Sequence, residues 1–560
     1  MTSRTPARTA RFLPAACLGG AVLALAGLAA LGAGSASGRP LAHAGSNPVR
    51  GGTLLAGIPD NPDHLDPALS YTNEGWQILQ ATDDGLLQFR RRAGSDGVKI
   101  VPDIATAMPK VSKDGLTYSF TLRSGVRFSP PVNRAVLASD FKFAIERLFR
   151  VDSGGVGFYT GIKGAEAYGK TRKGGISGIV ANDAKRTITF HLTDPDGTFL
   201  DYLAIPFAFA VPKGAPDKDV STIAKWRVGT GPYTISGYEP KHGVTITRNP
   251  NFKSWTPETP DGYLDRIEIK IGVTPQNAVN LTANGQLDWY FEPVAADRLS
   301  EVRARYRDQV HDYARGNVTY FDLNQRKKPF DKLAVRQAVN YAIDRTALVK
   351  IFGGQGTPTE NIIPPSFGHA YRKHSLYPYD LAKAKAMIAK AGVAGAKVEV
   401  WSHNTDPTPK AAQYMASVLT SIGFKATVKT VDESVYWDTI ATQKGDPQVA
   451  FNDWNQDYPE GQDFIDVILN GERITNVGNN NVSNSNIPAL NKRINAAKRL
   501  PLGPKRDAIW AQLDEAFMRQ DAGWVPFLNR QVTRFVSKRL NGLVFNPSYF
   551  ELLPSMWLSK

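Results

Sequence analysis

The amino-acid sequence predicts a mixed α/β protein, and three observations support this fold class. Segments with the two-residue hydrophobic period of strands alternate with segments of the 3.6-residue helical period along most of the chain. The sequence contains neither an internal repeat nor a long low-complexity tract. Its 42% content of hydrophobic residues is sufficient for large cores. Alternation of this kind is typical of layered α/β architecture.

The N-terminal region, residues 1–44, has the form of a secretory signal peptide. Three arginines precede a nearly uncharged run over residues 12–31, which is followed by small residues. The expected cleavage positions are after Ala44 or after Ala36. Because an apolar run of about 20 residues can also span a bilayer, an uncleaved membrane anchor remains open.

Cys17 is the only cysteine in the sequence. It lies near the start of the apolar run, whereas a lipoprotein signal has its cysteine at the end of that run. Pro14 also occupies the position three residues earlier, where such a signal has an apolar residue. We therefore expect no lipid anchor at Cys17. The exported part would contain no disulfide, thiol nucleophile or thiolate metal site.

The charge balance is basic, with 67 Lys and Arg against 52 Asp and Glu. Four of the basic residues and none of the acidic ones precede residue 45, so the exported part would carry 63 basic against 52 acidic residues, a net charge of +11. The basic residues are dispersed, with tight runs at 90–92 and 326–328. Nucleic-acid binding is associated with a clustered basic stripe, so we expect solvated surface charge and no nucleic-acid partner.

Strands are predicted where polar and apolar residues alternate, at Thr117–Arg123, Arg186–Leu192 and Arg266–Val273. Between the first two, a helix is predicted over 140–149, with Asp140 in its first turn, where a negative charge is favourable. The side chains expected to face the core are Phe141, Ala144, Ile145 and Leu148.

Two further helices are predicted in the second half of the chain. Over 329–345, entered at Pro329 and Asp331, the apolar face comprises Val335, Ala338, Val339, Ala342 and Ile343. The residues expected to face water are Arg336, Gln337, Asn340 and Asp344. A second helix follows Asp380 as N-cap and ends at Gly392, with Leu381, Ala384, Ile388 and Ala391 expected to be buried.

The sequence of residues 329–345, PFDKLAVRQAVNYAIDR, resembles a motif of the large extracytoplasmic solute-binding proteins of ABC importers, the peptide- and nickel-binding family. Further segments resemble that family in the same order along the chain. They are 113–129, 229–233 (GTGPY), 246–255, 283–290, 379–392, 454–464, 484–497 and 524–527. The resemblance covers nearly everything after residue 50.

The resemblance implies a periplasmic-binding-protein-like α/β fold of type II, in its large three-lobed form, with a ligand cleft between hinged lobes. Lobe I would comprise 45–90, 187–293 and 521–560, lobe II 91–186, and lobe III 294–520. The ligand would lie between lobes I and III, which close on it by hinge motion.

The implied function is that of an exported, periplasmic or cell-surface receptor that binds peptides and delivers them to the permease of an ABC importer. The resemblance also implies a monomer that has no cofactor and catalyses no reaction. Within the same fold an opine, an oligosaccharide or a nickel complex remains open as the ligand. A ligand sensor remains open as a function, because fold does not fix function.

The loop at 452–464 is the best candidate for a ligand site, because it combines carboxylates, an aromatic side chain and amides. By resemblance, Asp457 would pair with the α-ammonium of a peptide and Trp454 would form an aromatic wall. Asn455 and Tyr458 are further ligand candidates because of the mixed composition of the loop. The alternative is a surface turn with a helix cap, since Asp-Tyr-Pro-Glu-Gly is turn-forming in any protein.

Two positions of this loop differ from the family. Asp453 replaces a glycine, and Gly461 replaces a proline that is found in many relatives. The additional carboxylate would favour a more cationic ligand.

Three candidate ligand residues lie outside this loop. By resemblance, Tyr159 falls where relatives place a tyrosine that faces the ligand. Trp401 and His403 begin a strand and loop that reaches the cleft in relatives. Ordinary packing is the alternative for all three.

Motifs for metal binding and catalysis are weak or absent. The eight histidines are dispersed, and His369 and His374 lack the spacing of a helical metal pair. Neither Gly-x-Ser-x-Gly nor His-Glu-x-x-His occurs. Residues 164–171 fit the letters of a P-loop, but no buried strand precedes them. Ser139 and Lys142 form a Ser-x-x-Lys pair that lacks its companion motifs. We therefore expect no metal site and no secreted hydrolase.

Overall fold

The computed structural model describes residues 47–476 and 478–560. The predicted signal peptide, with Cys17 and the Ala36 and Ala44 cleavage positions, lies outside the described residues. Among the helices that are described, none combines the length and the apolarity needed to cross a membrane.

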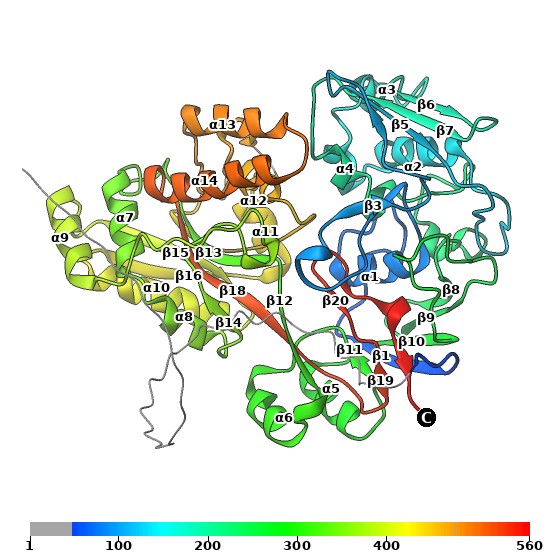
Figure 1. Cartoon of the computed structure of the whole chain (residues 1–560). Helices are drawn as coiled ribbons and strands as arrows, with labels where there is room; N and C mark the ends of the chain where they lie inside the picture. The colour runs from blue at the N-terminus through cyan, green and yellow to red at the C-terminus, as the bar shows by residue number, and fades with distance from the viewer. Residues whose placement is uncertain (1–46, 477) are drawn as a thin grey trace, which may run out of the picture. The chain divides into compact units, whose positions relative to one another are not determined.

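A five-stranded mixed sheet joins segments that are far apart in the sequence (Figure 1). Its order is β11 (Trp289–Tyr290), β1 (Thr53–Ile58), β10 (Arg266–Ile271), β9 (Gly243–Arg248) and β8 (Tyr233–Glu239). The strand predicted at 266–273 is therefore confirmed. The core of this sheet also contains Leu553 and Met556 from the C-terminal end of the chain and Ile78 from α1 (Asn73–Thr82). N-terminal, central and C-terminal segments thus share one core.

A second, antiparallel sheet has the order β4 (Lys110–Val111), β5 (Thr117–Thr121), β7 (Thr187–His191) and β6 (Ile179–Asn182). It confirms the two strands predicted at 117–123 and 186–192. The neighbouring helices are α2 (Ala138–Arg150), α3 (Ala165–Thr171) and α4 (Phe199–Tyr202). All four predicted core residues of α2 are buried. Asp140 accepts a hydrogen bond from the Leu137 N–H, 2.8 Å, and so caps the first turn.

The third sheet has the order β12 (Val310–Ala314), β18 (Trp524–Phe535), β13 (Asn317–Leu323), β17 (Val449–Asn455), β15 (Lys397–His403) and β16 (Lys425–Val431), with β14 (Gly356–Pro358) paired to β18. Different helices supply its two hydrophobic cores. One core includes α7 (Leu333–Ala342), α8 (Arg345–Ile351), α9 (Leu381–Ala391) and α10 (Thr408–Ser421). The other includes α12 (Gly461–Leu469), α13 (Pro488–Lys498) and α14 (Pro504–Gln520).

Shorter elements complete the described fold. The remaining helices are α5 (Pro275–Ala283), α6 (Leu299–Arg305) and α11 (Glu433–Ile440). Three two-stranded pairs are formed by β2 (Leu87–Phe89) with β3 (Ile100–Pro102), β19 (Leu540–Asn541) with β22 (Trp557–Leu558), and β20 (Phe545–Asn546) with β21 (Phe550–Glu551).

The segment predicted as one helix over 329–345 forms two helices. The first, α7, ends at Ala342, and Asp344 caps the second, α8, by accepting hydrogen bonds from the N–H groups of Thr346, 2.9 Å, and Ala347, 3.2 Å. The predicted apolar face is confirmed, since all five of its residues are fully buried.

The prediction that Arg336 and Asn340 face water is wrong. Arg336 donates hydrogen bonds to the carbonyl oxygens of Asp521 and Phe330, both 2.7 Å, and Asn340 donates to the carbonyl oxygen of Trp524, 2.9 Å. The segment that leads into β18 covers this side of α7, and Arg336 and Asn340 donate hydrogen bonds to its carbonyl oxygens. Burial of a polar side chain with its hydrogen bonds made carries little cost.

The end signals of α9 are confirmed. Asp380 accepts a hydrogen bond from the Lys383 N–H, 2.8 Å, and Gly392 adopts the left-handed conformation with φ 66°. Ala384 and Ile388 are buried, whereas Leu381 and Ala391, which were expected to be buried, are only half-buried.

The predicted lobe boundaries remain predictions, and two features of the sheets bear on them. Strand β7 extends the second sheet past residue 186. Strand β18 pairs with β12, β13 and β14 and so extends the third sheet past residue 520. The segment 194–198 contacts α13, which packs on the third sheet. The Gly197 N–H donates a hydrogen bond to the Lys498 carbonyl oxygen at the end of this helix, 2.9 Å.

Candidate functional site

The loop between β17 and α12 is held rigidly by hydrogen bonds to its backbone and side chains. Glu460 caps α12 by accepting from the Gln462 N–H, 2.7 Å. The fully buried Asp463 carboxylate accepts from the Asp457 N–H, 3.0 Å, and from the Trp454 indole N–H, 3.3 Å. The helix cap considered as an alternative therefore exists, but Glu460 makes it. The Asp457 carboxylate takes no part in this cap.

The Asp457 carboxylate meets a residue from the other end of the chain. The Tyr71 hydroxyl donates a hydrogen bond to its Oδ2 atom, 3.1 Å, across 386 residues of sequence. Tyr71 precedes α1 and is 44% exposed, whereas Asp457 is half-buried. Solvent thus reaches this contact.

Burial raises the pKa of Asp457 to about 7, although the hydrogen bond from Tyr71 acts in the opposite direction. Burial, together with the nearby Asp457 charge, also raises the pKa of Asp463 well above its usual range. Because the two carboxyl groups disfavour each other's ionisation, their charge state is sensitive to any cation that approaches Asp457.

Aromatic side chains that the sequence analysis did not identify surround Tyr71. Its ring stacks on Trp76 at 5.7 Å between centroids and meets Phe207 edge-on at 5.2 Å and Phe158 at 6.5 Å. They come from three separate segments, so no local pattern brings them together. Trp76 and Phe207 are buried, whereas Tyr71 and Phe158 are partly exposed and provide an apolar surface beside the Asp457 carboxylate.

The predicted aromatic residues of the loop mainly support it. Half-buried Trp454 packs against the core of α12 and α14. Tyr458 is buried, donates to the Gln462 side-chain oxygen and meets Tyr202 edge-on at 5.4 Å. Tyr159 is also fully buried, and its hydroxyl donates to the Tyr202 carbonyl oxygen, 2.6 Å. Ligand contacts by these residues remain predictions.

The amide of Asn455 lies at the end of β17, opposite Asn317. Its Oδ1 atom is buried and accepts no hydrogen bond from any described residue. An unsatisfied buried acceptor of this kind is rare in folded proteins.

Trp401 and His403 both lie in β15 and both contact Tyr436 of α11. Trp401 is buried, its indole N–H donates to Glu399, 2.5 Å, and the Lys429 ammonium lies 3.6 Å from its ring centroid. It packs in a small core with Tyr436.

His403 lies beside a charged group at the end of β17. Burial lowers its pKa, and Glu433, Arg530 and Asp453 act on it electrostatically. Its ring lies 5.5 Å from that of Trp437, which is 36% exposed and was not predicted. The His403 and Trp437 rings are therefore in contact.

The additional carboxylate of Asp453 is already compensated. It forms an ion pair with Arg530, 2.9 Å, and accepts a hydrogen bond from the Asn317 amide. Arg530 also donates to the Thr319 hydroxyl, 3.2 Å. Asp453 thus adds no free negative charge, and the expectation that it favours a more cationic ligand is not supported.

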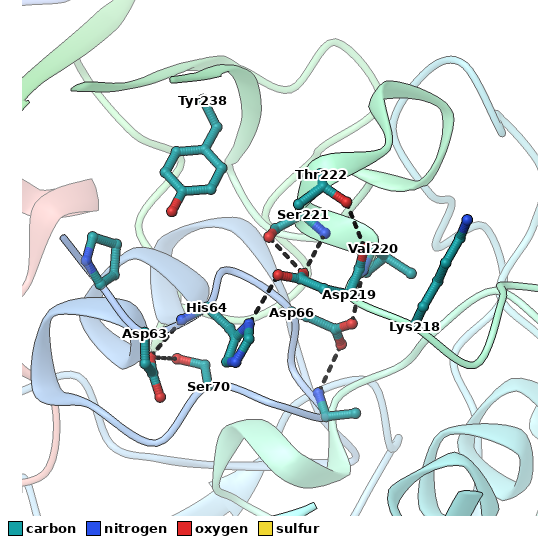
Figure 2. Close-up of polar contacts among 12 residues, drawn as sticks. Asp63, His64, Asp66, Ser70, Lys218, Asp219, Val220, Ser221, Thr222 and Tyr238 are labelled. Carbon is teal, nitrogen blue, oxygen red and sulfur yellow. Dashed lines mark hydrogen bonds and ion pairs between the residues drawn. The ribbon is translucent and has the colours of Figure 1, made fainter. Parts of the chain in front are cut away.

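A second polar cluster lies between residues 63–72 and 216–222 (Figure 2). The His64 Nδ1 atom lies 2.8 Å from the Asp219 carboxylate, and the Ser221 hydroxyl donates to the same carboxylate, 2.5 Å. A nucleophilic serine requires a hydrogen bond to the imidazole, with the carboxylate on the far side of the ring. Here the carboxylate lies between serine and histidine, so the cluster ties two loops together and does not form a catalytic triad.

A buried ion pair reinforces this connection between the two loops. The carboxylate of Asp66 accepts hydrogen bonds from both terminal nitrogens of Arg147 in α2, 2.7 and 2.6 Å, and both side chains are fully buried. The Val220 N–H donates to the same carboxylate, 2.9 Å. The first and second sheets are thereby connected beneath the segment that leads to Tyr71.

Comparison with known families and proteins gives a consistent result. Residues 99–476 match the family described as "Bacterial extracellular solute-binding proteins, family 5 Middle". The heme-binding protein A of Haemophilus influenzae is 26% identical over 88% of this chain and 89% of its own length. The dipeptide-binding protein of Pseudomonas aeruginosa is 25% identical, over 92% and 96%.

Solved structures share the fold. The clavulanic acid biosynthesis oligopeptide binding protein 2 superposes with a TM-score of 0.85 at 23% identity, covering 91% of this chain and 96% of that one. The ABC transporter-associated periplasmic binding protein DppA from Helicobacter pylori, solved with the peptide STSA, gives 0.73 at 23% identity, covering 91% and 99%.

Proposed function

The chain belongs to the bacterial extracellular solute-binding proteins of family 5, and from this premise we propose that it binds a peptide outside the cell and delivers it to the permease of an ABC importer. The family membership predicted from the ordered motifs is thus confirmed, as is the periplasmic-binding-protein-like fold of type II. The named relatives bind dipeptides or haem, and the similar structures include peptide-binding proteins.

The observation that carries the proposal is the placement of Asp457. A rigid loop presents its carboxylate beside an aromatic surface, with Tyr71 as a hydrogen-bond donor from the opposite end of the chain. An ammonium group would replace the proton that burial favours on this carboxylate, and a charged hydrogen bond in a partly desolvated site is strong. The α-ammonium of a peptide supplies such a group.

Binding requires no covalent step. Asp463 fixes the Asp457 backbone, Tyr71 and Asn455 offer polar contacts, and the aromatic surface around Tyr71 excludes water from apolar parts of the ligand. We propose that the ligand is held and released unchanged, so that the protein is a receptor and not an enzyme.

The location and partners follow from the same premise. We propose that residues 1–44 direct export, that the receptor acts as a monomer in the periplasm or at the cell surface, and that its partner is a membrane permease. An N-terminal segment that is not cleaved would anchor the same receptor to the membrane.

A thermal-shift screen of the chain from Gly45 onward tests the ligand class. The panel contains peptide pools from dipeptides to octapeptides, opines, oligosaccharides, nickel salts and haemin, the last because of the H. influenzae relative. A ligand at 100 times its Kd stabilises the folded state by about 2.7 kcal/mol. We expect peptides to shift the melting temperature and their N-acetylated forms to lose the effect.

The variant Asp457→Asn tests the contact itself, with Asp297→Asn as the matched control, because Asp297 is exposed and distant from the loop in the sequence. Loss of a buried charged hydrogen bond costs about 2 to 5 kcal/mol of binding free energy. Unchanged peptide affinity in Asp457→Asn would show that the contact is wrongly assigned. A shift with another solute class and none with peptides would refute the peptide assignment.

A further inference from the structure

One end of the third sheet is rich in exposed lysines and poor in acidic residues. It is the end at which β13 stops and β15, β16 and β17 begin. Two acidic residues, Asp331 and Asp446, occur in the segments that form it, which are 324–332, 390–397, 421–425 and 446–448. Five exposed lysines of these segments are called the lysine cluster below: Lys328, Lys332, Lys390, Lys397 and Lys425.

The fold brings the lysine cluster together from separate segments. The Gln448 side-chain amide donates hydrogen bonds to the carbonyl oxygens of Lys328, 2.8 Å, and Lys397, 3.3 Å. Lys397 and Lys425 are opposite each other at the first positions of the parallel strands β15 and β16. The basic run at 326–328 therefore lies beside lysines that follow it by about 70 and 100 positions. Basic residues that are dispersed in the sequence converge in the structure.

Part of this positive charge has a structural reason. The Lys332 ammonium donates a hydrogen bond to the Ala391 carbonyl oxygen at the end of α9, 2.9 Å, and Lys390 lies in the last turn of the same helix. Cations are favourable at a helix C-terminus. Lys327 is paired with Asp446, 2.9 Å. These contacts account for Lys327, Lys332 and Lys390.

The remaining lysines of the cluster have no such partner. The ammonium groups of Lys328, Lys397 and Lys425 form no ion pair with any residue in the described ranges 47–476 and 478–560. Neighbouring strands lie about 5 Å apart, so the like charges of Lys397 and Lys425 oppose the pairing of β15 with β16. An anion from outside the chain would relieve this repulsion.

We propose that the lysine cluster docks the receptor on anionic phospholipid head groups of the membrane that contains its permease. Lysine is a point charge without the fixed fork of arginine, so several lysines spread over one end of a sheet suit the many phosphates of a membrane surface. The apolar residues Phe330, Ile422 and Phe424 of the same segments are buried in the core. The contact is therefore electrostatic and reversible. It does not depend on which solute the receptor binds.

Vesicle sedimentation measures this docking with the chain from Gly45 onward. That chain contains every described sheet and lacks the apolar run 12–31, which would bind vesicles by itself. Vesicles that contain phosphatidylglycerol are compared with vesicles of phosphatidylcholine alone. We expect binding to the anionic vesicles that is at least about tenfold weaker on the zwitterionic ones, and equally weakened by about 0.5 M salt.

A fourfold variant tests the lysine cluster. A lysine near an anionic surface contributes about fivefold in affinity, so four substitutions should weaken binding about a hundredfold or more. They are Lys328→Gln, Lys390→Gln, Lys397→Gln and Lys425→Gln. The matched control removes the same charge from exposed lysines around the second sheet and should weaken binding less than about threefold. Its substitutions are Lys113→Gln, Lys163→Gln, Lys173→Gln and Lys185→Gln.

The outcomes decide the assignment. Equal losses in the two variants would show that net charge and not the lysine cluster is responsible, and would overturn the inference. Equal binding to both kinds of vesicle, or binding that ignores salt, would overturn it too, and these measurements need no variant to fold. Double-stranded DNA that binds more tightly than the anionic vesicles, with the same loss in the cluster variant, would refute the assignment to lipid. No peptide is present, so failure of docking leaves the proposed peptide receptor intact.

Discussion

The pH dependence of peptide affinity is the sharpest consequence of the Asp457 environment. In the ligand-free protein the pKa of this carboxyl group is about 7, because burial favours its neutral form. An ammonium ligand requires the ionised form. About half of Asp457 is ionised at pH 7 and about a tenth at pH 6, so the first pH unit below 7 weakens binding about fivefold, or by about 1 kcal/mol. Each further unit weakens it about tenfold, or by about 1.36 kcal/mol.

The α-amino group of the ligand sets the upper limit, since its pKa is about 8. Affinity should therefore be greatest between pH 7 and 8 and fall on both sides. Titration calorimetry from pH 5.5 to 9, in buffers with different ionisation enthalpies, measures both the affinity and the protons exchanged. Near pH 6 binding should release close to one proton, because Asp457 is protonated before binding and ionised after it.

Two variants test whether Asp457 causes the acid limb, which is the fall in peptide affinity below pH 7. Asp457→Asn should weaken binding and abolish that limb. Tyr71→Phe removes a hydrogen bond that lowers the pKa of Asp457, so the limb should move to higher pH. Affinity that is constant from pH 8 to 5.5, or an acid limb that persists in Asp457→Asn, would refute the reasoning. The stability of the ligand-free protein has the opposite sign: the raised pKa of Asp457 contributes stability that is present at low pH and lost as the pH rises toward 7.

Two other predictions concern stability and are measured by denaturant unfolding. Arg147→Ala leaves the fully buried Asp66 carboxylate unpaired and should cost about 3 to 5 kcal/mol, whereas Arg150→Ala, at a partly exposed ion pair, should cost less than about 1 kcal/mol; equal losses would contradict this assignment. Asp380→Ala removes the N-cap of α9 and should cost about 1 kcal/mol. Gly392→Ala should cost about 1 to 2 kcal/mol through its left-handed backbone alone, since no atom outside its chain neighbours crowds the added Cβ; an unchanged midpoint in either variant would refute the capping role.

Local patterns were sufficient to predict the strands and helices that carry them. The alternation in β5 and β7 and the apolar stripes of α2 and α7 each reflect a single element that buries one face. The ends of α9 were predictable because Asp380 and Gly392 act within one turn of the helix.

The misassigned residues depend on long-range contacts. Arg336 and Asn340 are buried because a segment about 180 positions later in the chain packs on α7. Periodicity within a helix contains no information about a strand of that kind, and polar residues are by default expected to face solvent.

The same limit applies to the candidate site. The ordered motifs indicated Asp457 through resemblance, but its contact with Tyr71 joins positions 386 residues apart. The missing hydrogen bond of the buried Asn455 Oδ1 atom also becomes visible only in the folded structure. The sequence shows which side chains exist, whereas the fold shows which of them lack a partner.

Native mass spectrometry of the protein with an equimolar library of free and N-acetylated peptides tests the central claim most directly. The account predicts one peptide per protein, recovered with its mass unchanged, drawn from the free peptides alone and lost in Asp457→Asn. Retention of acetylated peptides, or of cleaved products, would contradict the account of an ammonium-binding receptor that makes and breaks no bond.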